Sequence, residues 1–491
     1  MRCYYVLYNE GKVTMEEKAL SNRKRILNDL HEMKTVGELV DYIPIAIVQK
    51  IAFIILMTWS VSPIFVMGYG VSARLPDDAN WLTKLNQMNI MSINWYRILQ
   101  QLGFIGCLVG ILILMKSVRD GKKESITFEE YIKDRIVPIS LFLMLIWSVL
   151  SFAVSAGDIY SLTEDFNEVL IGGIFKREGI LTYLAIAGIF SCGFIVRSKK
   201  QIRWIIKLNT IVAVIQSILI LIDLNGINEF FGLTDGSGVF LNINHAGYYL
   251  SMSAMCGAYL AITEKKSKTK SAIYIIMFGL IAGALVSNSS LGPYLATLSA
   301  LISSVILAVW LNKILLSRVI TVIVVFFIST IIVSAIDGSL LVALQLFGIE
   351  LGMIASGQVE LDMGSNRLEL WKLGVDFIVE RPLFGYGPAG LTYAYKEVLG
   401  SHNRPHNEFI EHAATIGIPG LLFYVMALFN YLKKFYLNRN RVSTLSIGLL
   451  CIAISYLVSS LLGVTMFHTS AFFFMFSGLS IGQFSKTNVS L

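Results

Sequence analysis

Long apolar runs recur along nearly the whole of this 491-residue chain, and they restrict its fold more than any other feature. A run of about 20 apolar residues can cross the hydrocarbon core of a membrane as a helix. Because lipid offers the backbone no hydrogen-bond partners, such runs must satisfy their own peptide groups. The composition agrees, since 55% of the residues are hydrophobic and the mean hydropathy is +0.67. We therefore predict an all-α polytopic membrane protein.

Twelve such runs can be counted, and the first extends from Pro44 to Met67. The segment before it is polar and mixed in charge, which is not the pattern of a cleavable signal peptide. The predicted organisation is a cytoplasmic segment (1–43), helices one to nine (44–337), a large outer loop (338–413), helices ten to twelve (414–485) and a cytoplasmic tail (486–491).

Lys and Arg cluster in alternate connections between these runs. The clusters lie at residues 116–123, 197–203, 265–270, 313–318 and 433–441. Because short cytoplasmic loops carry an excess of Lys and Arg, we predict that these connections and both termini are cytoplasmic. The net charge of +7 is then a signature of topology and gives no reason to expect nucleic-acid binding.

The predicted outer loop, residues 338–413, is far longer than a connection between two helices requires, and such loops usually carry function or are disordered. Its stretch GSNRLELWKLGVDFIVERP has the apolar spacing of an amphipathic helix, which argues against disorder. We expect Asn366 to cap this helix and the Arg381-Pro382 pair to end it. The predicted apolar face consists of Leu368, Trp371, Val375 and Ile378.

The segment LFGYGPAGL places three glycines, Gly385, Gly387 and Gly390, at the GxGxxG spacing of a dinucleotide-binding motif. That motif requires a preceding strand inside a soluble βαβ unit, and an outer loop of a membrane protein does not provide one. We therefore interpret these glycines as positions where the backbone turns tightly.

The segment RPHNEFIEH near the end of the loop is where we expect the chemistry. Pro405 suits the first turn of a helix, so His406 and Asn407 should lie at a helix N-terminus. The partial positive charge there disfavours an imidazolium, which leaves His406 neutral near an anionic substrate. Arg404 and Arg367 can supply bidentate contacts to phosphate oxygens. The alternative at this point is that His406 only caps or packs at the membrane boundary.

A metal site is the other interpretation of His402, His406 and His412. Arg404-Pro405 interrupts any helix that would carry the first two, and the last two are six residues apart, hence on different helix faces. We therefore expect no metal.

The HN pair at 406–407, followed by Gly417 and Gly420, resembles the signature of the O-antigen ligase and O-antigen polymerase family. NRLELWKLGVDFIVERPLFGYGPAG is similar to the family segment that leads into the histidine, with Arg367 at its arginine position. FLNINHAGYYL and KREGILTYLA are similar to two further family segments, so that the resemblance covers roughly residues 170–430. Many family members carry an arginine a few residues before the asparagine-rich segment that corresponds to FLNINHAGYYL in this chain. Here no basic residue precedes that segment, so Arg177 or Arg404 would have to take the place of this arginine.

The resemblance implies a GT-C-like helical bundle and a glycosyltransferase of the bacterial cytoplasmic membrane. The donor would be a glycan on undecaprenyl pyrophosphate at the outer leaflet, and the acceptor a second glycan or a glycolipid. No cofactor and no divalent metal are implied.

The resemblance also suggests roles for residues. Arg367 and Arg177 are assigned to the pyrophosphate, and His406 to activation of the acceptor or to hydrogen bonding of the leaving group. Glu178 is either an alternative base or an ion-pair partner of Arg177. Candidate substrate-binding residues, some of which can equally be helix caps, are Arg404, Asn407, Asn242 and Asn244.

A transporter, or a flippase for lipid-linked sugars, is the main alternative from another class. Such proteins place substrate groups near the bilayer midplane and are often built from two related halves. The predicted spans are nearly free of charge apart from Lys50 and Lys207, and no repeat is visible. The concentration of polar residues in one outer loop favours the enzyme.

Overall fold

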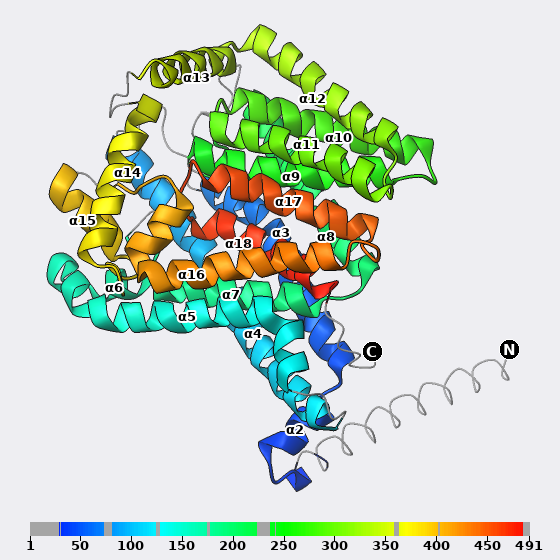
Figure 1. The fold of residues 1–491 in the computed structure, drawn as a ribbon, viewed down its shortest axis with the longest axis vertical. Coiled ribbons are helices and arrows are strands. Elements are labelled where there is room, and N and C mark those ends of the chain that lie inside the picture. Colours follow the sequence, from blue (N-terminus) through cyan, green and yellow to red (C-terminus); the bar gives the residue numbers. More distant parts are fainter. Residues whose placement is uncertain are drawn as a thin grey trace, which may run out of the picture.

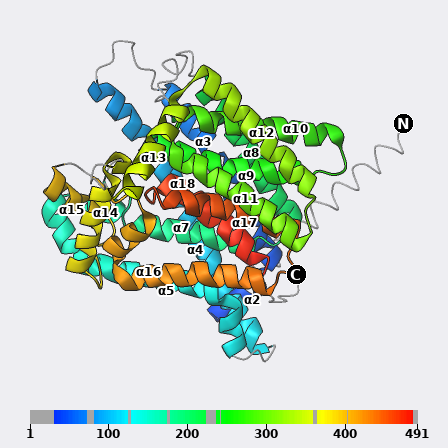
Figure 2. The ribbon, with the colours of Figure 1, turned by 45° about the horizontal axis from the view of Figure 1, so that its top comes forward.

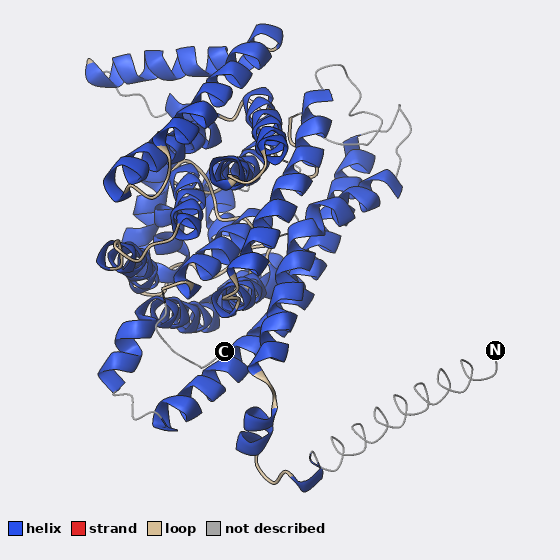
Figure 3. Ribbon diagram, turned by 90° about the vertical axis from the view of Figure 1, so that its right-hand side faces the viewer, coloured by secondary structure: helices blue, strands red, loops and turns tan. Residues whose placement is uncertain are grey.

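The computed structural model describes residues 29, 31–72, 81–123, 128–173, 177–222, 236–240, 242–357, 363–400 and 403–484. These residues form helices joined by loops (Figure 3), as predicted. A short helix α2 (Val36–Tyr42) precedes the long helices. The helices that make up the bundle are α3 (Ile45–Ser72), α4 (Trp81–Lys123), α5 (Phe128–Thr163), α7 (Ile180–Ile195), α8 (Lys199–Ile222), α9 (Ile243–Thr263), α10 (Lys268–Ser287), α11 (Leu291–Leu311), α12 (Leu316–Ile336), α16 (Glu408–Leu437), α17 (Thr444–Ser460) and α18 (Phe467–Gly482).

Eight helices in the described part of the chain are long and apolar enough to cross a membrane. They are α3, α4, α5, α8, α10, α11, α12 and α16. The remaining four predicted spans correspond to α7, α9, α17 and α18, which are shorter or less apolar. These four lie in the middle of the bundle and most of their residues are buried (Figure 1). A helix surrounded by protein need not match the apolar length of the lipid. The protein is therefore polytopic, and the count of twelve stays a prediction.

Helix α13 (Ser339–Ala355) opens the predicted outer loop and is apolar on all sides. Only Leu340 is buried among its residues, whereas Val342 and Leu346 are more than half exposed. Its one acidic side chain, Glu350, accepts a hydrogen bond from the backbone N–H of Gly364 at 2.9 Å. This contact ties α13 to the start of α14 (Met363–Glu380).

Three helices cover one end of the bundle, which we call the capped end: α6 (Phe166–Ile171), α14 and α15 (Gly390–Leu399). Figure 1 shows them together at the end of the bundle where α16 begins, and Figure 2 shows α14 and α15 at the same end. Helices α5 and α16 lie side by side there. Because α6 and α15 lie far apart in the sequence, this end is assembled by tertiary contacts.

One prediction about α14 is wrong, and the predicted apolar face is confirmed only in part, because Ile378 packs on the buried cluster and Val375 does not. The helix begins at Met363, and Asn366 lies inside it with φ +64°, so Asn366 does not cap it. The side chains that it buries include Leu370 and Phe377, whereas the predicted face residue Val375 is 47% exposed. The reason is that α14 packs on Tyr395 of α15 and on α16, and those partners select one of two apolar stripes. The predicted end of the helix at Glu380 is confirmed.

The glycine-rich segment after α14 is a tight turn, as expected. Gly385 and Gly387 have φ values of +64° and +80°, which glycine adopts without strain. The N–H groups of Tyr386 and Gly387 donate to the carbonyls of Ala414 and Thr415 at 2.9 and 2.8 Å. The turn is thereby fixed against the first half of α16.

Helix α16 is kinked where this turn meets it. Gly417 has φ +74°, and a Cβ there would lie 1.9 Å from the carbonyl oxygen of Leu383. The N–H of Ile418 donates to the carbonyl of Pro382 at 2.8 Å, and the indole of Trp147 donates to the carbonyl of Ile416 at 3.0 Å. Gly417 is thus required for a close approach of two backbone segments.

Candidate functional site at the capped end

Arg404 lies at the centre of a buried ion-pair network at the capped end. Its side chain is 5% exposed, and one guanidinium nitrogen contacts Glu178 at 3.0 Å while the other pairs with Glu411. The second nitrogen also donates to the carbonyl of Thr465 at 3.0 Å. Glu411 in turn accepts a hydrogen bond from the N–H of Thr465 at 2.9 Å. One cation therefore joins the segment before α7, the first turns of α16 and the connection between α17 and α18.

Glu178 is held from two sides. Its other oxygen accepts a hydrogen bond from the hydroxyl of Thr392 on α15. Glu178 forms an ion pair with Arg404. The role of Glu178 as a base stays a prediction.

Arg177, the residue before Glu178, is buried and has a left-handed backbone with φ +47°. A residue other than glycine in this conformation is held there by its surroundings, which include a hydrogen bond from the Thr182 hydroxyl to the Arg177 carbonyl. Its guanidinium lies 6.0 Å from the ring centroid of Tyr96. Burial lowers the pKa of Arg177 from its ordinary value, whereas nearby Tyr96 and Glu168 act in the opposite direction.

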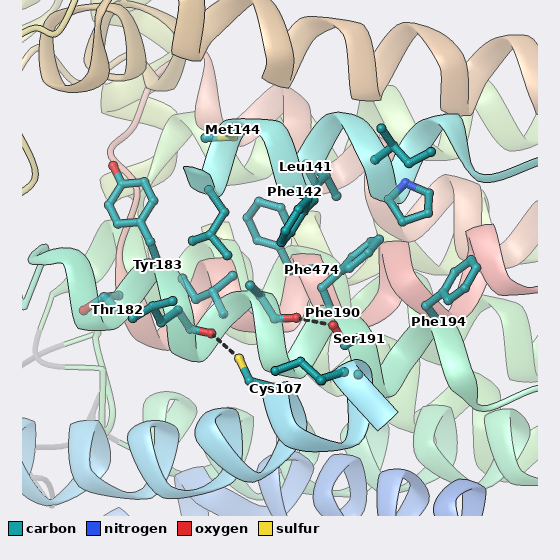
Figure 4. A pocket seen from close by; sticks show the side chains of 18 of the residues that line it. Cys107, Leu141, Phe142, Met144, Thr182, Tyr183, Phe190, Ser191, Phe194 and Phe474 are labelled. Carbon is teal, nitrogen blue, oxygen red and sulfur yellow. Dashed lines mark hydrogen bonds between the residues drawn. The ribbon is translucent and has the colours of Figure 1, made fainter. Parts of the chain in front are cut away.

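A cavity of about 520 Å³ extends from this network between α4, α5 and α7. It follows α7 from Thr182 to Ile195, a rise of about 20 Å along the helix. Most of its wall is apolar, and Figure 4 shows several of the side chains that line it, among them Leu141, Phe142, Met144, Phe190 and Phe474. Its charged side chains include Arg177, Glu178, Arg404 and Glu411 at the capped end and Lys116, Arg135 and Arg197 at the opposite, basic end.

Helix α16 begins at Glu408, close to the predicted position, but Pro405 and His406 precede it, so Pro405 does not lie in its first turn. Asn407 is the N-cap, and its side-chain oxygen accepts hydrogen bonds from the N–H groups of Phe409 and Ile410 at 3.0 and 3.2 Å. Its amide also donates to the carbonyl of Leu461 at 3.2 Å. His406 is half-buried with φ +49° and is not among the residues that line the cavity.

Arg367 lies in the first turns of α14 and is also half-buried. It is close enough to the hydroxyl of Tyr248 on α9 for an electrostatic interaction, and it does not line the cavity. The predicted site residues thus fall into two groups. Arg177, Glu178 and Arg404 line the cavity, whereas Arg367 and His406 lie outside it.

Asn242 and Asn244 belong to the start of α9. Asn242 is the N-cap, and its side-chain oxygen accepts from the N–H of Asn244 at 2.8 Å. The side-chain oxygen of Asn244 accepts from the hydroxyl of Ser290 at 2.7 Å. A capping function is therefore sufficient to explain Asn242.

We expect Asn242→Ala to lower the free energy of unfolding by about 1 kcal/mol, because the exposed N–H groups lose their acceptor. Asn242→Asp keeps an oxygen acceptor and should retain wild-type stability. Thermal unfolding of the two purified variants checks this. If Asn242→Asp is stable but inactive, the side chain has a second function in binding substrate.

Sequence reasoning missed the two residues that complete the network, Glu411 and Thr392, and it considered His412 only as a metal ligand. Glu408, Glu411 and His412 follow the HN pair at helical spacing, which was the available signal. His402 lies outside the described residues. Among the residues that the structure does describe, no group of three His, Cys, Asp or Glu side chains is arranged to hold a metal ion.

These features define a class: a multi-pass helical membrane protein whose apolar cavity ends at buried arginines and carboxylates beneath a helical cap. Residues 275–425 match the family model described as O-antigen ligase, which confirms the resemblance to that family. The matched segment contains Arg367, Arg404 and His406, whereas Arg177 and Asn242 lie outside it. No curated protein matches the chain.

Proposed function

We propose that the protein is a glycosyltransferase of the bacterial cytoplasmic membrane. It joins a glycan from an undecaprenyl-pyrophosphate-linked donor to a glycan or glycolipid acceptor at the outer face, in the manner of an O-antigen ligase or polymerase. The observation that carries the proposal is the cavity, because its long apolar wall and its polar end with Arg177 complement a lipid tail attached to a pyrophosphate. The family match agrees with this assignment.

In this proposal the donor tail lies between α4, α5 and α7, and the pyrophosphate lies at the capped end. Arg177 stabilises the negative charge that grows on the leaving pyrophosphate, since a buried cation acts more strongly in a medium of low dielectric constant. Arg404 orders this end through its two carboxylate partners. The orientation with both termini in the cytoplasm remains part of the proposal.

The reaction is a direct displacement with inversion at the anomeric carbon. The acceptor oxygen forms its bond to that carbon while the bond to the pyrophosphate oxygen breaks, and the electron pair leaves with the pyrophosphate. A nearby base must take the hydroxyl proton. His406 is assigned either to this step or to a hydrogen bond with the leaving group, and Arg367 to the pyrophosphate. The reaction needs no divalent metal.

A flippase for lipid-linked sugars is the second candidate. The observation in its favour is that the same cavity has basic side chains at both ends, with Arg177 at one and Arg135 and Arg197 at the other. A groove of this kind suits a lipid phosphate that moves from one side of the membrane to the other.

The deciding experiment uses the purified full-length protein, with and without EDTA. Reconstituted vesicles receive undecaprenyl-pyrophosphate-linked glycans and acceptor glycolipid extracted from the bacterium that makes the protein. We expect joined glycan and released undecaprenyl pyrophosphate, both insensitive to EDTA. Movement of lipid-linked glycan across the vesicle without joining would favour the flippase instead, and loss of product in EDTA would contradict metal independence.

Arg367→Lys is expected to lower the rate of transfer by at least about tenfold, because a bidentate contact to phosphate is replaced by a single point charge. The initial rate of glycan joining checks this. Lys372→Arg on the exposed part of the same helix is the matched control and should retain the wild-type rate. Equal rates for Arg367→Lys and the wild type would mean that Arg367 is structural.

A further inference from the structure

Glu408 and His412 form a buried pair on α16 that the assignments above do not use. Glu408 is fully buried and His412 is 2% exposed. They are four residues apart, one helical turn, and the distance from His412 Nε2 to Glu408 Oε1 is 3.5 Å. Burying an acid beside an imidazole is costly unless the pair has partners or a function.

The pair is incompletely hydrogen-bonded within the described structure. Neither ring nitrogen of His412, nor Oε2 of Glu408, has a hydrogen-bond partner there. The hydroxyl of Tyr456 donates a long hydrogen bond to Glu408 Oε1 at 3.5 Å, and the hydroxyl of Tyr424 also interacts with this carboxylate. The ring of Tyr424 packs against the imidazole edge to face at 4.8 Å between centroids. Buried polar atoms without partners indicate a site for water or a ligand.

His412 also lines the cavity, on the wall that includes Glu411 and Thr415. The same cavity reaches Arg177 and Arg404. Of the histidines in the described residues, His412 is therefore the one that faces the space assigned to the donor, whereas His406 lies outside that space. His468 provides a comparison, because it is similarly buried and its ring nitrogens also lack hydrogen-bond partners in the described structure. It packs on Trp95, with 5.1 Å between the ring centroids, and it does not line the cavity.

We propose that His412, positioned by Glu408, is the base that removes the proton from the acceptor hydroxyl. This inference rests on the proposed glycosyltransferase function. As the acceptor oxygen bonds to the anomeric carbon and the pyrophosphate departs with its electron pair, the hydroxyl proton moves to a ring nitrogen of His412. The carboxylate of Glu408 stabilises the imidazolium that forms. In other enzymes that use a nucleophile and a base, a third group orients the base in the same way. The proton is released to water after the product leaves.

His412→Gln tests the catalytic role in the reconstituted transfer assay. We expect kcat to fall by about 100-fold or more, with KM for the extracted lipid-linked donor unchanged, because the base acts only in the transition state. The matched control is His468→Gln, which removes a histidine of similar burial and should keep wild-type kcat. Added imidazole is expected to restore part of the turnover of His412→Gly, since the cavity gives access to the vacated space.

Glu408 gives a test that does not depend on how His412 variants fold. Glu408→Asp keeps the carboxylate, whereas Glu408→Gln keeps the size of the side chain. If Glu408 acts through its charge, the Asp variant should retain more turnover than the Gln variant. If Glu408 only fills space, the Gln variant should retain more. Wild-type kcat in His412→Gln, or no rescue by imidazole in a folded His412→Gly, would overturn the proposal and leave the proposed function intact. An inactive wild type would instead contradict the function and the base together.

Discussion

Replacing Arg404 with Met is expected to lower the free energy of unfolding by about 3–5 kcal/mol. The substitution leaves Glu178 and Glu411 buried without their cation, and their side chains are only 12% and 5% exposed. The cost comes from the uncompensated carboxylates more than from the lost attraction. Thermal unfolding in detergent micelles measures the change.

The control for this prediction is Arg381→Met, which removes an ion pair of similar length but different burial. Arg381 contacts Asp158 at 2.8 Å, and the two side chains are 39% and 62% exposed. Exposed pairs contribute about 0–1 kcal/mol, so the control should unfold close to the wild-type temperature. Adding Glu411→Gln to Arg404→Met should recover part of the loss, because it removes one buried charge. Equal stability of Arg404→Met and Arg381→Met would mean that the network is not required for folding.

The second large effect concerns activity: His406→Ala is expected to lower glycan transfer by about 100-fold or more, since it removes the imidazole beside the positive end of α16. Alanine also strains the backbone, because His406 has φ +49°. His406→Asn separates the two causes, since asparagine tolerates the left-handed conformation. We expect the Asn variant to fold and insert normally and to be as inactive as the Ala variant.

Product formation in the assay with lipid-linked donor and acceptor measures both variants. Wild-type transfer by His406→Asn would show that the position requires only its backbone conformation. In that case the buried His412 would be the one remaining histidine among those assigned to the reaction.

Local patterns in the sequence were sufficient for much of the structure. The apolar runs predicted helices because hydrogen bonds inside a helix are local. Pro405 predicted the start of α16 to within a few residues, although the proline itself precedes the helix. The spacing of Gly385 and Gly387 predicted a tight turn, because the positive φ values there are a local property. The family resemblance, now supported over residues 275–425, rested on the same local motif.

Contacts between distant segments could not be predicted in this way. Glu178 and Arg404 are 226 residues apart, and nothing in either neighbourhood indicates that they pair. The buried face of α14 depended on α15 and α16, because the helix has apolar residues on more than one side. Whether a histidine faces the cavity likewise depended on how α16 is rotated against α5 and α7. The hydrogen bonds of helices, caps and tight turns join residues that are close in the sequence and can be predicted from it, whereas burial, ion pairs and hydrogen bonds between remote segments exist only once those segments have packed together.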